Sequence, residues 1–344
     1  MQRILESNRF KHLPMRPGFG SFMHPTPERL QFIKQLGVDD ILLNMYRNSL
    51  IDTNYDALPL PGDHQWEYSD LLSLRNKIED AELRLFAIEN LPFSFYDKIM
   101  MGEPGREKQL EHVKRTIFNI GRAGIPVLGY AWTPTGVWRS STNYKIRGGA
   151  EVMSVDLEDF KYAPLSHGRV YSEEEMWDNY QYFIEAVVPV AEESGVTLAL
   201  HPNDPPTETL AGVPQLFRSF EAFKRAIGMV ESDNHGLQFC LGSWSEMGVD
   251  IHEVIDYFGP LKKLVYVHFQ VVSGPVPKFH EIFIDQKGHY DPVLVLKHLK
   301  TINFDGMIMP GHVPKVVGDG PWKERSRAYT IGYIKGIMAS LDQD

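Results

Sequence analysis

The chain has 344 residues, with 35 Lys and Arg against 45 Asp and Glu, and a formal net charge of −10. Hydrophobic residues make up 43% of it and aromatic residues 12%, which excludes a disordered chain and supplies enough apolar surface for a large core. The acidic balance disfavours nucleic acid and anionic membranes as partners, because both select basic surfaces. A single cysteine excludes an internal disulfide and an all-cysteine zinc site.

Short β-rich runs alternate with amphipathic helical stretches along the chain. The predicted strands are residues 18–23, 40–45, 83–89, 126–132, 196–201, 236–240, 263–269 and 306–310. The predicted helices are residues 27–36, 68–81, 105–124, 172–195, 213–230, 250–258, 292–301 and 322–341. Eight strands, each followed by a helix, favour a closed (β/α)8 TIM barrel. An open doubly wound sheet of six or seven strands is the alternative.

The helix expected at residues 172–195 has a sequence signal at each end. Ser172 followed by Glu175 is typical of a capping box, and Gly195 is a typical stop. Between them, Phe183 and Val187 recur at helical spacing.

Residues 1–344 are expected to form one domain, because no Pro/Gly/Ser-rich linker divides the chain. Two connections, residues 133–171 and 270–291, are too long for simple barrel loops. Both would emerge at the C-terminal face of a barrel, where such folds place their active sites. Decorative or oligomer-forming insertions are the alternative for these connections.

Residues with metal-binding side chains close consecutive predicted strands. The fifth strand runs into His201, the sixth into Cys240 and the seventh into His268, and His312 follows the eighth. In a barrel these strand ends meet at one rim, so the sequence predicts a shared metal site. Two imidazoles and a thiolate suit Zn²⁺, Fe²⁺ or Mn²⁺ better than Mg²⁺ or Ca²⁺. A buried core cysteine, structural histidines, or a Cys240–His268 nucleophile pair are the alternatives.

Aromatic residues and an arginine surround the end of the fourth strand. Tyr130, Trp132, Trp138 and Arg139 suit a polyhydroxylated, anionic ligand, because rings stack on sugar faces and a guanidinium clamps a carboxylate. Core aromatics with a surface arginine would give the same pattern. Glu89 ends the third strand and is a candidate to orient a ligand or a metal-bound water.

The chain has no sequence motif for a nucleotide cofactor. The glycines at 18 and 20 lack the third glycine of a dinucleotide fingerprint, and no phosphate-binding GxxxxGK loop occurs. No apolar run reaches the roughly 18 residues of a membrane helix, and the N-terminus has no stretch of signal-peptide type. We therefore expect a cytoplasmic enzyme with a small-molecule substrate.

Several segments resemble the mannonate dehydratases, metal-dependent barrels of the xylose-isomerase-like group. Residues 201–206, HPNDPP, are close to the HPDDPP signature of that family. Residues 236–243, GLQFCLGS, fit its cysteine ligand, and Val267-His268 fits its second histidine ligand. Residues 106–132 and 176–206 carry most of the remaining likeness. The resemblance implies Mn²⁺ or Fe²⁺ as cofactor, with Zn²⁺ a further candidate, and a homodimer is a possible assembly.

The chain departs from the family pattern at chemically important positions. The Pro-Asp-His that supplies an aspartate ligand and a catalytic histidine reads Pro310-Gly311-His312 here. The family's His-Leu-Arg-Asn reads HFQV at 268–271, so an arginine that would face the substrate is missing. The His-Glu pair expected near residue 94 and the tyrosine expected near residue 325 are also absent.

The resemblance implies a lyase that dehydrates a mannonate-like aldonate to a 2-keto-3-deoxy acid after C2 proton abstraction. The metal ligands would be His201, Cys240 and His268, and the catalytic candidates are His312 and Tyr130. The candidates for substrate binding are Arg139, Trp138, Trp132, Asn203 and Glu89. The departures leave two alternatives open: a sugar isomerase or epimerase of the same barrel group, and a non-catalytic ligand-binding descendant.

Overall fold

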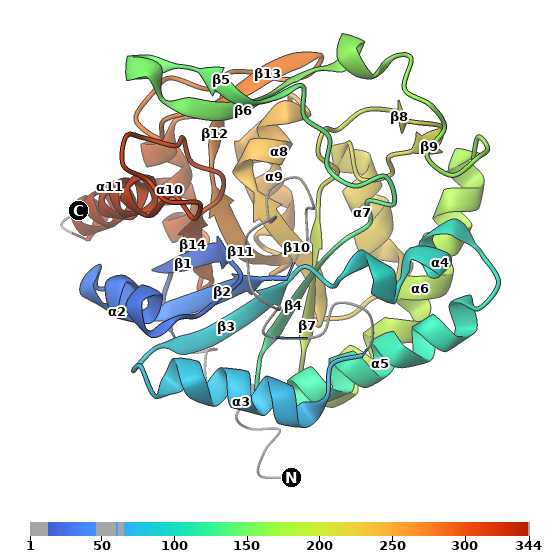
Figure 1. Ribbon diagram of the computed structural model, residues 1–344. Coiled ribbons are helices and arrows are strands. Elements are labelled where there is room, and N and C mark those ends of the chain that lie inside the picture. The colour runs from blue at the N-terminus through green and yellow to red at the C-terminus, as the bar shows by residue number, and fades with distance from the viewer. Residues whose placement is uncertain (1–12, 46–59, 61–64, 343–344) are drawn as a thin grey trace.

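The computed structural model describes residues 13–45, 60 and 65–342, and its centre is a closed barrel of parallel strands (Figure 1). In chain order the barrel strands are β1 (Arg16–Phe22), β2 (Asp40–Asn44), β3 (Arg84–Glu89), β4 (Val127–Ala131), β7 (Thr197–His201), β10 (His235–Cys240), β11 (Leu264–Phe269) and β14 (Met307–Pro310). Their order around the barrel is β1-β14-β11-β10-β7-β4-β3-β2, and β14 pairs with β1 to close it. The predicted TIM barrel is therefore confirmed, and the open sheet is excluded.

Helices surround the barrel, one after each strand. The principal helices are α2 (Pro27–Gln35), α3 (Tyr68–Glu79), α5 (Arg106–Arg122), α6 (Glu173–Ser194), α7 (Phe220–Met229), α9 (Ile251–Phe258), α10 (Pro292–Thr301) and α11 (Glu324–Leu341). The shorter helices are α4 (Asp97–Met101) and α8 (Leu241–Glu246), with single 3₁₀ turns at Phe93–Phe95, Arg147–Gly149 and Leu157–Phe160. Among the described residues, none of these helices combines the length and apolarity that crossing a bilayer requires.

Most predicted bounds hold to within a few residues, and the main error is the helix expected at 213–230. It starts only at Phe220, because Ser219 caps it by accepting a hydrogen bond from the Ala222 N–H. The residues before the cap form β9 (Val213–Pro214), which pairs with β8 (Thr209–Leu210). Local turn and cap chemistry there outweighs the apolar periodicity that suggested a longer helix.

The caps of α6 are partly as predicted. The Ser172 hydroxyl accepts a hydrogen bond from the Glu175 N–H at 3.1 Å, and Gly195 ends the helix in the left-handed conformation at φ 67°. The reciprocal half of the capping box is absent, because the Glu175 carboxylate pairs with Arg169 instead.

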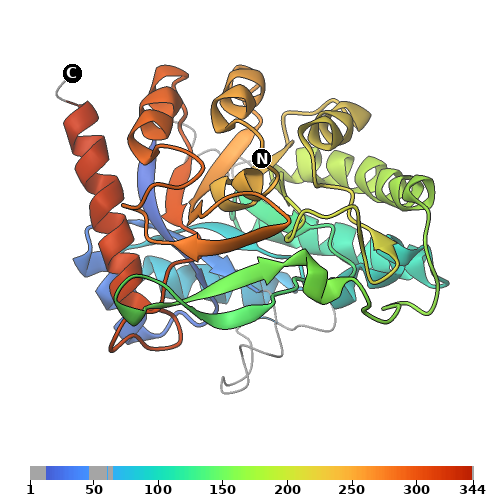
Figure 2. The ribbon, with the colours of Figure 1, turned by 90° about the horizontal axis from the view of Figure 1, so that it is seen from above.

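The two long connections pair with one another in a second sheet. β5 (Ser141–Lys145) and β6 (Glu151–Asp156) follow β4, whereas β12 (Val271–Val272) and β13 (Lys278–Ile282) follow β11. They form an antiparallel sheet in the order β12-β13-β6-β5, with Phe279 opposite Val155. Figures 1 and 2 show β5, β6 and β13 side by side next to the barrel. That residues 1–344 form one domain stays a prediction.

Apolar side chains fill both the inside and the outside of the barrel wall. The residues of the inner cluster are Leu42, Phe86, Ala87, Val127, Ala199, Tyr266, Met307 and Met309. A larger cluster lies between the strands and the helices and includes Phe183 and Trp244. Because strand side chains alternate between faces, each strand contributes to both layers.

A buried ionic cluster closes the N-terminal end of the barrel. Asp40, the first residue of β2, is fully buried and pairs with Arg16 of β1 through the Arg16 Nε. Its Oδ1 accepts a second bond from the Arg84 Nε of β3 at 2.6 Å. One carboxylate thus ties three neighbouring strands at the end of the barrel opposite to the strand ends that carry His201 and His268.

We predict that Asp40→Ala lowers the free energy of unfolding by about 3 kcal/mol, because it leaves two guanidinium groups without their buried partner. Urea denaturation measures this change. Glu111→Ala removes the exposed ion pair with Lys114 and should cost less than about 0.5 kcal/mol. Equal losses in the two variants would contradict the role given to Asp40.

Candidate metal centre and active-site pocket

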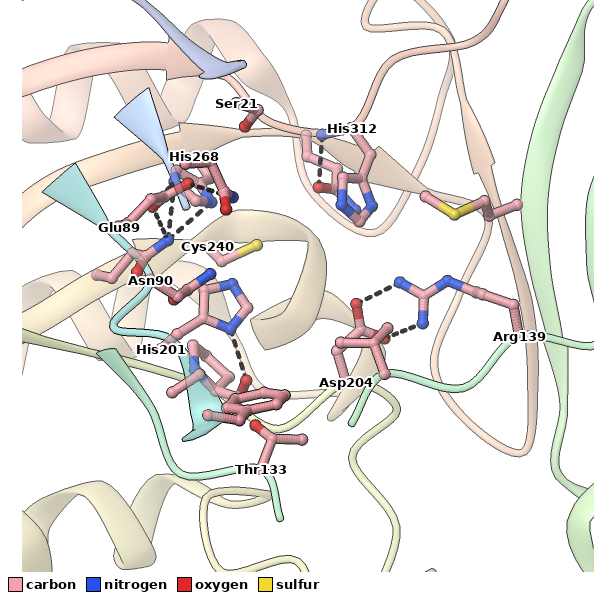
Figure 3. A pocket seen from close by; sticks show the side chains of 18 of the residues that line it. Ser21, Glu89, Asn90, Thr133, Arg139, His201, Asp204, Cys240, His268 and His312 are labelled. Carbon is pink, nitrogen blue, oxygen red and sulfur yellow. Dashed lines mark hydrogen bonds and ion pairs between the residues drawn. The ribbon is translucent and has the colours of Figure 1, made fainter. Parts of the chain in front are cut away.

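Three predicted metal ligands meet at the C-terminal rim of the barrel. His201 ends β7, Cys240 ends β10, and His268 lies near the end of β11 directly opposite Cys240. One ligand atom from each, the Cys240 Sγ and a ring nitrogen of each histidine, lies within 4.8 Å of the other two. Figure 3 shows the three side chains pointing into one pocket. Two imidazoles and a thiolate are donors that Zn²⁺, Fe²⁺ and Mn²⁺ accept.

Both histidines have a second contact that orients the ring. The Nδ1 of His201 lies 2.6 Å from the Pro202 carbonyl oxygen, which can only accept, so this nitrogen carries the proton and Nε2 is left for a metal. The Nε2 of His268 lies 3.0 Å from a carboxylate oxygen of Glu89. Contacts of this kind fix the tautomer of histidine ligands in metal sites.

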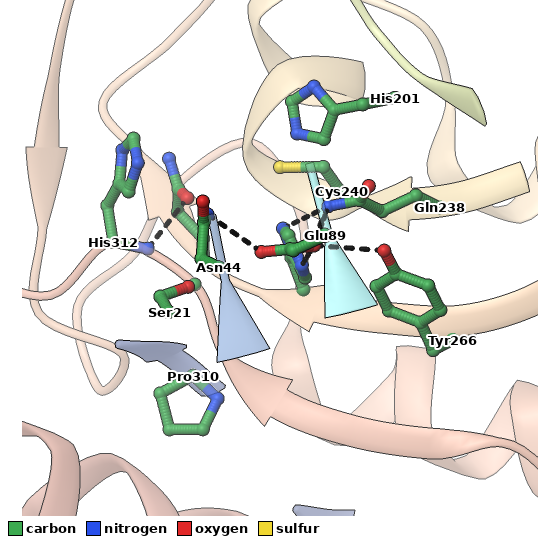
Figure 4. Close-up of polar contacts among 12 residues, drawn as sticks. Ser21, Asn44, Glu89, His201, Gln238, Cys240, Tyr266, Pro310 and His312 are labelled. Carbon is green, nitrogen blue, oxygen red and sulfur yellow. Dashed lines mark hydrogen bonds and ion pairs between the residues drawn. The ribbon is translucent and has the colours of Figure 1, made fainter. Parts of the chain in front are cut away.

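Glu89 is a fully buried carboxylate, drawn below His201 and Cys240 in Figure 4. Its Oε1 accepts a hydrogen bond from the Asn44 side-chain amide at 3.0 Å. Its Oε2 accepts from the Tyr266 hydroxyl at 2.9 Å and from the Gln238 amide. Gly129 of β4 leaves the space for this group, since a Cβ there would lie 2.5 Å from the Tyr266 hydroxyl oxygen.

The charges in the pocket favour a cation. Burial would raise the pKa of the Cys240 thiol, but His201 and His268 outweigh burial and hold this pKa well below its usual value. Burial would likewise raise the pKa of Glu89, and His268 outweighs it and lowers this pKa. The two histidines therefore favour the deprotonated forms of Cys240 and Glu89, and the thiolate is the form of cysteine that binds a metal ion.

His312 lines the same pocket from the other side. It follows β14 and is about one-third exposed, so its ring is accessible from the pocket. Its Nδ1 lies 2.8 Å from the Oε1 of Glu281, a buried residue of β13 in the second sheet. The barrel and the second sheet thus each supply a member of this His–Glu pair.

Arg139 also lines the pocket, but it is bound to another side chain. Its two terminal nitrogens contact the two carboxylate oxygens of Asp204, with Nη1 2.7 Å from Oδ1. Burial would raise the pKa of Asp204, and Arg139 outweighs it and lowers this pKa. Burial, and next the charge of Asp204, raise the pKa of the neighbouring Glu246 carboxyl well above its usual value. Arg139 is therefore a paired group in the wall of the pocket.

Four predicted site residues lie elsewhere. Tyr130 points away from the barrel interior, and its hydroxyl contacts Tyr180 at 2.9 Å and His235 at 3.0 Å. Trp132 and Trp138 pack against other aromatic rings, and the Asn203 side-chain amide donates a hydrogen bond to a backbone carbonyl oxygen. None of the four is among the residues that line the pocket, so we leave them out of the proposed site.

Sequence reasoning missed Gln238, which lines the pocket, and also Tyr266 and Glu281, which contact the pocket residues Glu89 and His312. Gln238 and Tyr266 each precede a ligand by two positions, Cys240 and His268, so strand alternation places them on the same inner face. That signal was available in the sequence. Glu281 gave no such signal, because its place depends on the pairing of β13 with β6.

Gln270 fills the space next to Gly311. A Cβ on Gly311 would lie 2.8 Å from the Gln270 Oε1 and 3.3 Å from the His268 Cβ. On its other side Gln270 abuts Gly242, where a Cβ would lie 2.5 Å from the Gln270 Nε2. The Gln270 Oε1 also accepts a hydrogen bond from the His312 N–H at 2.9 Å. Gln270 and Gly311 are therefore packed against each other.

Comparison with known proteins identifies the family. The family model of D-mannonate dehydratase (UxuA) matches residues 15–166 and 157–344 of this chain. The chain belongs to the D-mannonate dehydratase family. Within this family, the mannonate dehydratase of Streptococcus equi subsp. zooepidemicus is 30% identical over 298 residues, which are 78% of this chain and 80% of that relative. The crystal structure of mannonate dehydratase from Streptococcus suis serotype 2 matches with a TM-score of 0.83 at 27% identity, over 95% of each chain.

Barrels outside this dehydratase family share the fold alone. D-psicose 3-epimerase from Clostridium cellulolyticum H10 matches with a TM-score of 0.59 at 11% identity, over 94% of this chain and 99% of that chain. A xylose isomerase domain protein from Planctomyces limnophilus matches with the same TM-score and identity. The predicted family is confirmed. Its members are hydro-lyases, and this class extends to the present chain without fixing its substrate.

We predict that Gly311→Ala lowers the free energy of unfolding by about 1–2 kcal/mol, because the new methyl group meets a side chain that is confined on both sides. Adding Gln270→Ala should recover part of this loss by opening the space. Urea denaturation of the two single variants and the double variant measures the coupling. Strictly additive losses would show that the two positions are not packed against each other.

Proposed function

We propose that this chain dehydrates a sugar acid, a mannonate-like aldonate, to a 2-keto-3-deoxy acid. The observation that supports this proposal is that His201, Cys240, His268 and His312 line one pocket of a D-mannonate dehydratase fold. Three of them present ligand atoms to a common point, and the fourth has a titratable ring facing the same space.

His201, Cys240 and His268 would hold Mn²⁺ or Fe²⁺, with Zn²⁺ a further candidate. Three protein ligands are a normal number for a catalytic metal site, so the glycine at 311 does not prevent binding. The cation would supply Lewis-acid stabilisation for the negative charge that develops on the substrate when the C2 proton leaves. Glu89 would orient the His268 ring.

His312 would act as the general base and then as the general acid. Its Nε2 takes the proton from C2, and a C2–C3 double bond forms as the C3 hydroxyl leaves. The same nitrogen returns a proton to the departing hydroxyl, which leaves as water. The resulting enol becomes the 2-keto-3-deoxy acid when C3 gains a proton and the C2 hydroxyl loses its own to form the carbonyl. The substrate loses one water in total.

The Arg139–Asp204 pair would face the polyhydroxyl chain of the substrate. Both residues line the pocket, and together they offer hydrogen-bond donors and acceptors. Because Asp204 already occupies the guanidinium, we assign the pair to hydroxyl groups and not to the substrate carboxylate. A cytoplasmic location and a homodimer stay predictions.

A panel of aldonic and uronic acids, assayed with Mn²⁺ and read by mass spectrometry, tests the proposed reaction. Loss of one water from an aldonate supports it. A rearranged product of unchanged mass would instead select an isomerase or epimerase. Turnover of no acid, together with less than about 0.1 metal ion per chain, would select a non-catalytic descendant.

We predict that His201→Ala loses bound metal and activity, because it removes one of only three proposed ligands. His312→Ala should keep the metal and lower kcat by about 100-fold or more, because it removes the proposed base. Elemental analysis and steady-state kinetics measure the two effects. His167→Ala, a substitution outside the pocket, is the control and should change neither. Unaltered metal content in His201→Ala would show that the site is misplaced.

A further inference from the structure

We propose that Glu281 is a positioning residue that selects the reactive tautomer of His312. Its carboxylate would keep the proton on Nδ1 and thereby leave Nε2 free to accept the substrate proton. This inference rests on the proposed function, in which His312 moves that proton.

The second sheet holds Glu281 in place on both sides. β13 pairs with β6 through Lys278, Phe279 and His280, and with β12 through Glu281 itself. The Glu281 side chain is 2% exposed, and its Oε2 accepts a hydrogen bond from the Met153 N–H of β6 at 3.3 Å. The carboxylate is therefore fixed by its backbone and by one of its own oxygens.

The other carboxylate oxygen faces His312. The Oε1 of Glu281 lies 2.8 Å from the His312 Nδ1, and both atoms are buried with no hydrogen-bond partner of good geometry. Two unpaired polar atoms at this distance form a hydrogen bond after a small rotation of the ring. Catalytic hydrogen bonds often tighten in this way when substrate binds.

The charge on Glu281 decides which nitrogen carries the proton. Burial would raise the pKa of Glu281, but His312, Lys323 and Arg139 outweigh burial, and the pKa is lowered. An ionised carboxylate only accepts hydrogen bonds, so the facing Nδ1 must be the donor. In neutral imidazole the other nitrogen, Nε2, is then the acceptor.

The same carboxylate would serve the reaction after proton transfer. When Nε2 takes the C2 proton, the ring becomes an imidazolium next to an ionised Glu281, and this pairing stabilises it. Glu281 itself does not take up the proton. This division of roles is the one that a buried carboxylate has beside the histidine of serine hydrolases.

Glu281→Gln is an informative variant because it should reverse the tautomer. Only the amide oxygen can accept the Met153 N–H, so the amide nitrogen would turn towards His312 and donate to Nδ1. The proton of the ring would then reside on Nε2, where it blocks the base. We expect kcat to fall about 10²–10⁴-fold, with KM changed less than about 3-fold and metal content unchanged.

Nitrogen NMR of ¹⁵N-histidine-labelled protein tests the tautomer without relying on turnover. His312→Gln identifies the signals of this ring. In the wild-type protein at a pH where the ring is neutral, we expect a protonated Nδ1 and an unprotonated Nε2, and the reverse in Glu281→Gln. Glu151→Gln removes a carboxylate from the same sheet, outside the pocket, and should leave both the signals and kcat unchanged.

Kinetics of the double variant separate positioning from a general structural role. If Glu281 acts through His312, Glu281→Gln should cost no further activity in the His312→Gln background. A wild-type ring protonated on Nε2, or additive losses in the double variant, would overturn the proposal. If no aldonate is turned over, the proposed function fails, and the NMR result still decides whether Glu281 sets the tautomer.

Discussion

Closure of the parallel barrel is the constraint on which the site depends. Because β14 pairs with β1, the strand ends lie on a ring, and residues far apart in sequence converge at one rim. The buried carboxylate of Glu89 then links this rim across the barrel, from Asn44 on β2 to Gln238 and Tyr266 on β10 and β11. The position of the His268 ring is therefore a property of the whole barrel and not of one loop.

This constraint explains which parts of the structure could be predicted from the sequence. Each strand has a local signature, and a side chain at the end of a strand has only one rim to occupy, so His201, Cys240 and His268 could be brought together without coordinates. The alternation of side chains along β4 also predicts which face of the barrel wall Tyr130 occupies. Gly129 faces the interior, where a side chain would meet Tyr266, so Tyr130 must face the helices.

The remainder of the site depends on pairing between distant segments, which no local pattern encodes. The two long connections are too long for simple barrel loops, and the sequence alone shows this. Only the pairing of β13 with β6, however, places Glu281 beside His312. In the same way, the sequence showed an arginine near an aromatic cluster, and only the fold shows that Arg139 is bound to Asp204. Side chains on loops are positioned by such tertiary contacts and not by their own periodicity.

The packing around Gly311 shows how this chain accommodates a glycine next to the proposed base. Gln270 occupies the space beside the glycine and supports the His312 backbone, so the local structure has no gap where a side chain is missing. Gly311 and Gln270 are therefore packed against each other without a cavity between them. Since His312 is held by Gln270 through its backbone and faces Glu281 through its ring, the geometry of the proposed base does not depend on an aspartate at position 311.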